Sequence, residues 1–219
     1  AAERGYGSVT AEGLDRNEYP FPSGFVGVFA LDFLNRSPLT RNGSGYLNTQ
    51  RAFGDATSRT RVGQGFQIQQ QALVSYIAVF MGKVEAPTDN LTCVVETNSS
   101  GIPSGTAVTN GTSATVAGTV LQTRMRYVVF TFDPPMLLLE NTVYHWTLRR
   151  SGAADATNYY IVGEDDGNNY SYGAASTRDA TTWSAVSGSD FLFAVSPRTD
   201  WITYAKANWA YRPASADQL

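Results

Sequence analysis

The sequence predicts an all-β protein, and three observations lead to that prediction. Aromatic residues make up 12% of the 219 residues, charged residues only 16%, and there are 20 glycines. Short runs rich in Val, Ile, Thr, Tyr and Phe alternate with runs rich in Gly, Ser, Asn and Pro, which is typical of strands joined by polar turns. Between residues 62 and 196, no stretch repeats its apolar side chains with the 3.6-residue period of an amphipathic helix.

The expected strands follow one another closely enough to form two stacked sheets. Residues 75–81 are apolar on both faces, which indicates a strand buried between layers. Tyr144, Trp146 and Leu148 alternate with other residues and are expected to point inward. The Asp-Pro-Pro run at 133–135 is expected to end its strand, because proline cannot continue a ladder. The expected strands are 65–68, 75–81, 90–97, 106–121 as one strand or two, 126–132, 143–148, 157–163 and 190–196, with a long loop over 163–188. This spacing favours a jelly-roll β-sandwich.

The segments on either side of the expected sandwich differ from it in composition and in hydrophobic pattern. Residues 62–196 form the predicted domain, residues 1–61 an extended N-terminal arm, and residues 197–219 a short aromatic C-terminal tail. Large rings beyond a finished core need a surface to bury against, either on their own domain or on a partner. Six such rings are the candidate partner-binding residues: Phe21, Phe25, Trp201, Tyr204, Trp209 and Tyr211.

The charge and cysteine content argue against several classes of protein. The formal net charge is -3, and Arg149-Arg150 is the only adjacent basic pair, so nucleic acid is not an expected partner. No run of about 20 apolar residues is present, so no membrane insertion is expected, and the first residues lack the apolar core of a signal peptide. The one cysteine, Cys93, lies in an alternating apolar run and is predicted to be a buried core thiol.

The sequence does not assemble a recognisable catalytic group. His145 is the only histidine, and it is expected to face solvent or a strand neighbour because Tyr144 and Trp146 point the other way. One histidine and one core cysteine leave nucleophilic mechanisms little to build on. The adjacent Asp165 and Asp166 do not show the separated carboxylate pair that glycoside hydrolysis requires. We therefore predict that the protein is not an enzyme.

The run from Gly163 to Asn169 concentrates carboxylate and amide oxygens. Calcium prefers such oxygens, so Glu164, Asp165 and Asp166 are candidate calcium ligands, and calcium is the one cofactor that the sequence suggests. The Asp-Gly and Asn-Asn pairs of this run are also plain turn signals. A solvated turn is the alternative that we favour.

Several aromatic residues gather in the expected 163–188 loop. Exposed flat rings stack on the apolar faces of sugars, so Tyr170, Tyr172 and Trp183 are candidate carbohydrate-binding residues. The alternative is that Trp183 and part of the tyrosines pack in the core or against turns, and this alternative is the more common one.

Four groups of residues, in a fixed order, resemble the pattern of a known family. They are Gln64-Gly65-Phe66, the pair Asn90–Glu96 and Gly101–Gly105, the pair Val128–Pro134 and Leu139–Trp146, and the closing stretch Thr181–Val195. The stretch from Gln64 to Val195 resembles a family of jelly-roll domains that are similar in architecture to carbohydrate-binding modules. These domains recur in bacteriophage virion proteins and in secreted or surface proteins of bacteria. The resemblance implies the fold more strongly than the function, and it brings no catalytic residues with it.

Two functions are expected from these observations. The first is a non-catalytic structural or binding component of a phage or phage-like particle, located on the virion as a capsid decoration, head fibre or tail-fibre component. Its partners would be capsid or tail proteins, its attachment would use the terminal arms, and it would be a homo-oligomer. The alternative is a carbohydrate-binding module of a secreted bacterial protein, with host surface glycans as ligands.

Overall fold

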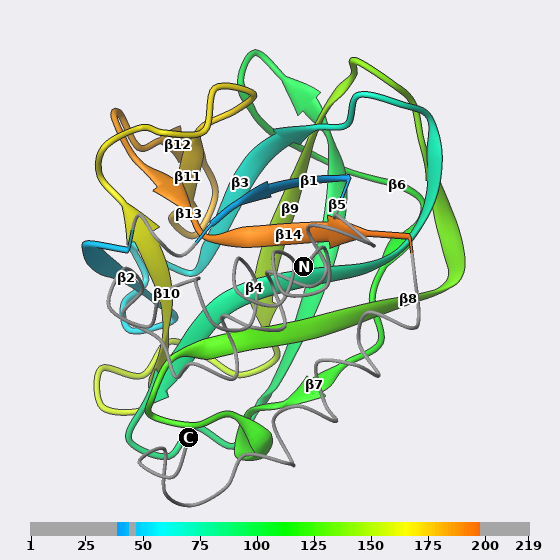
Figure 1. Cartoon of the computed structure of the whole chain (residues 1–219). Helices are drawn as coiled ribbons and strands as arrows, with labels where there is room; N and C mark the ends of the chain where they lie inside the picture. The colour runs from blue at the N-terminus through cyan, green and yellow to red at the C-terminus, as the bar shows by residue number, and fades with distance from the viewer. Residues whose placement is uncertain (1–38, 44–46, 198–219) are drawn as a thin grey trace, which may run out of the picture. The chain divides into compact units, whose positions relative to one another are not determined.

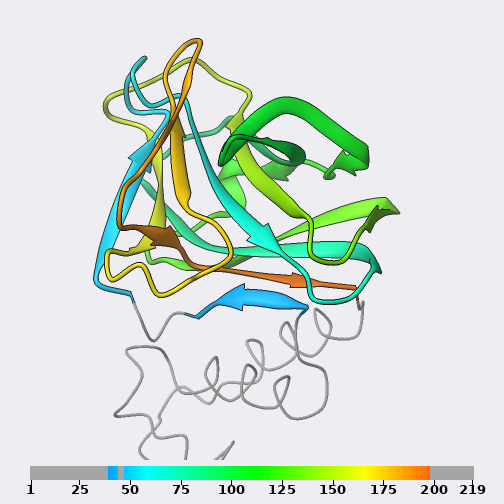
Figure 2. The same ribbon diagram turned by 90° about the horizontal axis from the view of Figure 1, so that it is seen from above.

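A computed structural model describes residues 39–43 and 47–197, and Leu39–Pro197 form one compact unit. Two seven-stranded antiparallel sheets are packed against each other (Figure 1; Figure 2), so the predicted all-β sandwich is confirmed. Sheet A contains β1 (Thr40–Asn42), β2 (Thr49–Phe53), β4 (Ala72–Val84), β8 (Arg126–Leu138), β10 (Tyr159–Asp165), β13 (Asp190–Phe191) and β14 (Phe193–Ser196). Sheet B contains β3 (Arg61–Gln67), β5 (Asn90–Ser99), β6 (Ile102–Thr112), β7 (Val116–Ala117), β9 (Val143–Arg150), β11 (Ala175–Arg178) and β12 (Trp183–Ala185).

The path of the chain places sequence neighbours on opposite sides of the core. Strands β3, β4 and β5 alternate between the sheets, and so do β8, β9, β10 and β11. The one helical element among the described residues is a short 3-10 turn, η3 (Gly118–Val120). None of these residues forms a helix that is long and apolar enough to cross a membrane.

Aromatic side chains from both sheets meet in the core. Trp146 of sheet B lies 6.0 Å from Phe191 and 5.9 Å from Phe193 of sheet A, measured between ring centroids. Tyr144, Trp146 and Leu148 are all buried, so the predicted inward face of β9 is confirmed. Cys93 is completely buried, as predicted, and burial raises the pKa of its thiol. Such a thiol stays protonated and packs as a small apolar side chain.

Strand β8 corrects the prediction that proline ends it. The strand continues to Leu138, but its pairing with β4 is interrupted: Thr131 pairs with Tyr76 and Met136 with Val74, with a register shift between Val74 and Tyr76. Residues 132–135 therefore have no ladder partners on β4. Among the described residues, β8 pairs only with β4, so its far side is an edge of the described sheet, where proline's missing N–H is tolerated.

The domain boundary also differs from the prediction. The end of the predicted arm belongs to the sandwich, because β1 pairs with β14 and β2 pairs with β10. The predicted loop over 163–188 likewise contains β11 and β12. These strands are three to five residues long and mostly polar, so their sequences lack the apolar alternation that predicts a strand. They form because they pair with other strands of the two sheets. The six predicted partner-binding residues, Phe21, Phe25, Trp201, Tyr204, Trp209 and Tyr211, lie outside the described residues.

The two segments that flank the sandwich join it at one place. Strand β1 lies at the end of the strand order of sheet A, next to β14 (Figure 1). Thr40 is opposite Val195, and the backbone N–H of Leu39 donates to the carbonyl of Val195 at 2.8 Å. Because the pairing is antiparallel, the start of β1 and the end of β14 are adjacent. Residues 1–38 and 198–219 are thus connected to neighbouring strand ends.

Candidate functional site

The predicted calcium loop is a turn built around the carboxylate of Asp165. Asp165 is buried at the end of β10, and its carboxylate accepts hydrogen bonds from the backbone N–H of Gly167 at 2.9 Å and from the Asn169 amide at 3.0 Å. The backbone N–H of Asn169 donates to the same carboxylate. An aspartate that closes its own turn in this way stabilises the loop from inside the protein.

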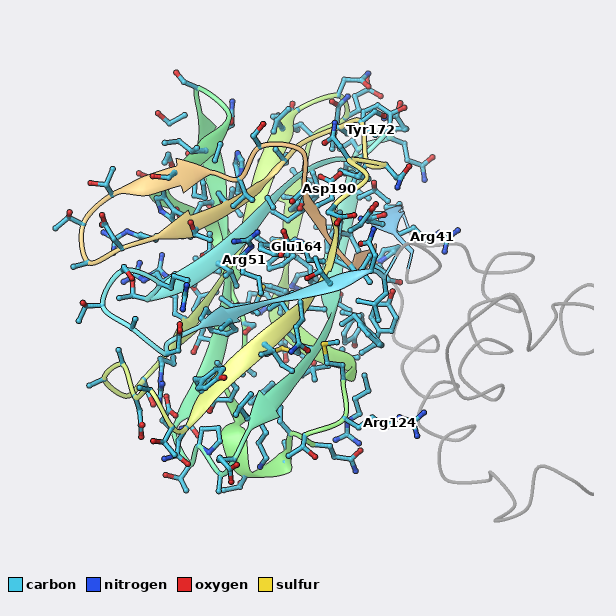
Figure 3. All side chains as sticks on the ribbon, turned by 90° about the vertical axis from the view of Figure 1, so that its left-hand side faces the viewer. Arg41, Arg51, Arg124, Glu164, Tyr172 and Asp190 are labelled. Atoms are coloured by element: carbon cyan, nitrogen blue, oxygen red, sulfur yellow. The ribbon has the colours of Figure 1, made fainter. Side chains whose placement is uncertain are left out.

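The two neighbouring carboxylates are also engaged. Glu164 is buried and forms an ion pair with Arg51 at 2.5 Å, and Figure 3 shows the two side chains directed toward one another. Asp166 is exposed and bonds to Asn48 through both its carboxylate and its backbone N–H. Within the described part of the chain, no group of three or more His, Cys, Asp or Glu side chains is placed to hold a metal ion. The structure therefore does not bring Glu164, Asp165 and Asp166 together as calcium ligands.

The three predicted sugar-stacking rings occupy different environments. Tyr170 is buried against Phe193 at 5.2 Å, and its hydroxyl is hydrogen-bonded to that of Thr40 at 2.7 Å. Burial raises the pKa of Tyr170 to about 12. Trp183 is buried on β12, whereas Tyr172 is 44% exposed beside Tyr170 (Figure 3). Of the three rings, only Tyr172 presents a face to solvent.

Two residues of the family-like pattern meet as hydrogen-bonding partners. The amide of Gln64 donates to the carboxylate of Asp190 at 2.9 Å and accepts from the backbone N–H of Phe191 at 2.7 Å. Asp190 also accepts from the backbone N–H of Tyr170 at 3.0 Å, and burial raises its pKa. Both side chains are buried, so this pair joins β3 to β13 inside the sandwich. Its role is structural, because neither group reaches solvent.

His145 is buried, so of the two expected surroundings, solvent or a strand neighbour, the structure shows the second. It points to the outer face of sheet B, but the backbone at Gly173 and Ala174 crosses that face, and Gly65 donates to the carbonyl of Ala174 at 3.0 Å. A Cβ at Gly65 would lie 3.1 Å from both His145 and Gly173, so the covering segment is tightly packed. His145 bonds to the Asn98 side chain at 2.9 Å, and burial lowers its pKa to about 4. The ring is therefore neutral at pH 7.

A buried carboxylate organises the same face of sheet B. Glu96 accepts from Arg149 at 2.6 Å, from the hydroxyl of Thr147 at 3.1 Å and from the backbone N–H of Gly105 at 2.7 Å. Its side chain is completely buried, while that of Arg149 is 32% exposed. Glu96 could not be recognised from the sequence, because the alternation of β5 places it on the face opposite to Leu91, Cys93 and Val95, which a simple pattern assigns to solvent.

Three arginines lie in a row across sheet B, and they too could not be recognised from the sequence. In the strand register, Arg61 of β3 is opposite Arg149 of β9 on one side and opposite Arg178 of β11 on the other. Directly opposed residues of neighbouring strands share a face, so the three side chains project together. We call this set the arginine row. The arginines are separated by 29 to 117 positions in the sequence, so only the strand order could have revealed them.

A cavity of about 330 Å³ opens beside the arginine row. Arg61, Arg178 and Arg150 line it, and its other lining residues are small or uncharged, including Gly54, Gly152 and Ala180. Arg150 is neutralised by Asp89 through two hydrogen bonds of 2.8 and 2.9 Å, and it also bonds to the carbonyls of Gly54 and Asn158. None of the lining residues is acidic.

Comparison with known proteins identified no relative. Scans of protein-family models, of curated proteins and of solved structures each returned no match.

Proposed function

We propose that this protein is a non-catalytic structural or binding component of a bacteriophage or phage-like particle, attached through the segments that flank its sandwich. In this role it would be a capsid decoration, a head fibre or part of a tail fibre, its partners would be capsid or tail proteins, and it would act as a homo-oligomer on the virion. The family resemblance of residues 64–195 motivates the setting.

One observation supports attachment through the terminal segments. Both segments are connected to the sandwich at the paired ends of β1 and β14, so an attachment there would involve a single edge of sheet A. Together they carry the six aromatic residues that sequence analysis predicts to bind a partner. Aromatic anchors contribute a large share of the binding energy in protein interfaces.

The outer face of sheet A offers apolar surface that fits the same role. Leu73 and Leu137 are directly opposed on β4 and β8 and are 58% and 51% exposed, and Leu139, two residues beyond Leu137, is 48% exposed. Neighbouring exposed leucines are a feature of protein-binding surfaces. The buried state of His145 and Cys93 fits a protein that binds rather than catalyses.

Truncation tests the proposed attachment. The full chain, a variant lacking residues 1–38, a variant lacking 198–219, and the sandwich alone (39–197) would be added to particles that lack this protein. We expect the full chain to co-sediment with the particles and the sandwich alone to remain in solution. Circular dichroism and thermal melting would establish that each variant is folded, and light scattering would give its oligomeric state. Undiminished attachment of the folded sandwich would contradict the proposal.

A carbohydrate-binding module is the second candidate, and the exposed ring of Tyr172 is the observation that favours it. A stacking contact of this kind contributes about 1 kcal/mol, so Tyr172→Ala should weaken glycan binding several-fold without changing stability. Trp183→Ala is the matched comparison, because it removes a buried ring and should lower stability. Equal glycan-array signals for Tyr172→Ala and the unchanged protein would count against this function.

A further inference from the structure

The arginine row concentrates like charges where a sheet ordinarily avoids them. Like charges directly opposite one another on neighbouring strands are destabilising, and here two such pairs share Arg61. Burial and then the charges of Arg149 and Arg178 lower the pKa of Arg61, and the charge of Glu96 opposes them only in part. A folded protein retains such an arrangement at a cost in stability, which a bound anion would offset.

The partners that the described residues supply neutralise only part of this charge. Glu96 pairs with Arg149. Arg178 donates to the backbone carbonyls of Ala180 and Thr181 at 3.1 and 3.0 Å, which are neutral groups. For Arg61, the described part of the chain supplies no side-chain hydrogen bond and no ion pair.

The nearest acidic side chain in sequence lies within electrostatic range of Arg178, but the described contacts include no hydrogen bond or ion pair between the two. Asp179 follows Arg178, but its carboxylate accepts from the backbone N–H groups of Thr181 and Thr182 at 2.7 and 2.6 Å. It therefore caps the turn between β11 and β12. Within the described part of the chain, the guanidinium groups of Arg61 and Arg178 have no ion pair with a carboxylate, and they line a cavity that has no acidic residue among its lining.

We propose that this cavity is a binding site for an oxyanion, in which Arg61 and Arg178 hold a sulfate, phosphate or carboxylate group. The planar guanidinium presents paired N–H donors that match two oxygens of such a group. Glycine and alanine at the other walls leave room for the rest of the ligand. The cavity volume of about 330 Å³ is at the lower end of the range for small-molecule sites, and it suits a free anion or one acidic sugar unit. The site lies in the sandwich and does not depend on the attachment proposed above.

Titration of the full chain followed by NMR tests this site. The probes are inorganic sulfate, inorganic phosphate, glucuronate and a sulfated chondroitin disaccharide, at constant low ionic strength, with N-acetylglucosamine as the neutral control. We expect saturable shifts of the Arg61 side-chain N–H resonance with the anions and none with the neutral sugar. Tighter binding of the disaccharide than of sulfate would identify an anion carried by a saccharide, and equal binding would identify the free ion. Either result supports the site.

Arginine variants make the test specific. Arg61→Gln should weaken anion binding at least about ten-fold, since it removes a charged hydrogen-bonding group. Arg124→Gln removes the same charge from an exposed position outside the cavity (Figure 3) and should leave binding unchanged. Arg61→Lys keeps the charge but loses the planar donor pair, so it should bind with intermediate affinity. The melting temperature of Arg61→Gln should not fall, because the substitution relieves repulsion. Absence of saturable shifts with every anion, or unchanged affinity of Arg61→Gln, would overturn the proposal.

Discussion

The acidic loop over 164–166 and the arginine row are both clusters of like charge, and the fold treats them in opposite ways. Each carboxylate of the loop has a partner inside the protein: Arg51 for Glu164, the turn itself for Asp165, and Asn48 for Asp166. The arginine row has one carboxylate, Glu96, for three guanidinium groups. The carboxylates of the loop are hydrogen-bonded or ion-paired within the protein, whereas Arg61 and Arg178 of the row have no carboxylate partner among the described residues and are the groups that we propose to bind an anion. A charged run in the sequence is therefore a poor guide to a site until its internal partners are known.

The largest expected effect concerns the one cavity arginine that is fully neutralised. Asp89 bonds to Arg150, to the hydroxyl of Tyr160 and to the backbone N–H of Gly152. Burial opposes ionisation of Asp89, but these hydrogen bonds hold its pKa below the ordinary value. Asp89→Ala should lower the free energy of unfolding by about 3 kcal/mol, because it leaves the buried guanidinium of Arg150 without a carboxylate partner. Urea denaturation measures this change, and a loss of less than about 0.5 kcal/mol, as for an ordinary exposed residue, would mean that Arg150 has another partner.

The second effect is a pH dependence beside the arginine row. The pKa of His145 is lowered from 6.5 to about 4 by burial, with the charge of Glu96 opposing. The unfolded state therefore binds a proton in this pH window before the folded state does, so stability falls as pH drops from 6.5 toward 4. The loss should amount to about 3 kcal/mol at most. The free energy of unfolding, measured by urea denaturation at several pH values, should fall more steeply with decreasing pH for the unchanged protein than for His145→Gln. Parallel pH profiles would contradict the lowered pKa of His145.

A third effect tests whether the acidic loop is structural. Glu164→Gln removes the charge that faces Arg51, whose side chain remains 29% exposed and partly hydrated. The expected loss is about 1–2 kcal/mol, while Asp166→Asn at the exposed end of the loop should change stability by less than about 0.5 kcal/mol. Thermal melting of the two variants checks the contrast. Equal losses of stability in the two variants would show that the buried ion pair of Glu164 with Arg51 stabilises the protein no more than the exposed contact of Asp166 does.

The smallest expected effect is that of calcium. Because the loop carboxylates are already hydrogen-bonded, we expect calcium to shift the melting temperature by less than about 1 °C relative to magnesium or a chelator. A rise of several degrees that Asp165→Asn abolishes would show that the loop rearranges around the ion. That result would also remove the contrast with the arginine row.

The sequence by itself determined the class of fold and most of the long strands. Composition and period-2 alternation depend on local chemistry, which is why β9, with its buried Tyr144, Trp146 and Leu148, was predictable in detail. The short strands β1, β2, β11 and β12 were not predictable, because pairing with distant strands forms them rather than their own residues.

Only the tertiary structure decided which polar residues are available to a ligand. Alternation places His145 and Glu96 on the outer face of sheet B, but both are buried: the backbone at Gly173 and Ala174 crosses over His145, and Gly105 of β6 donates to Glu96. It also cannot align Arg61 with Arg149 and Arg178, since that row depends on the order and register of three strands far apart in the chain. Local patterns report which face of a strand a residue occupies, whereas burial and charge pairing depend on what the rest of the chain lays over that face.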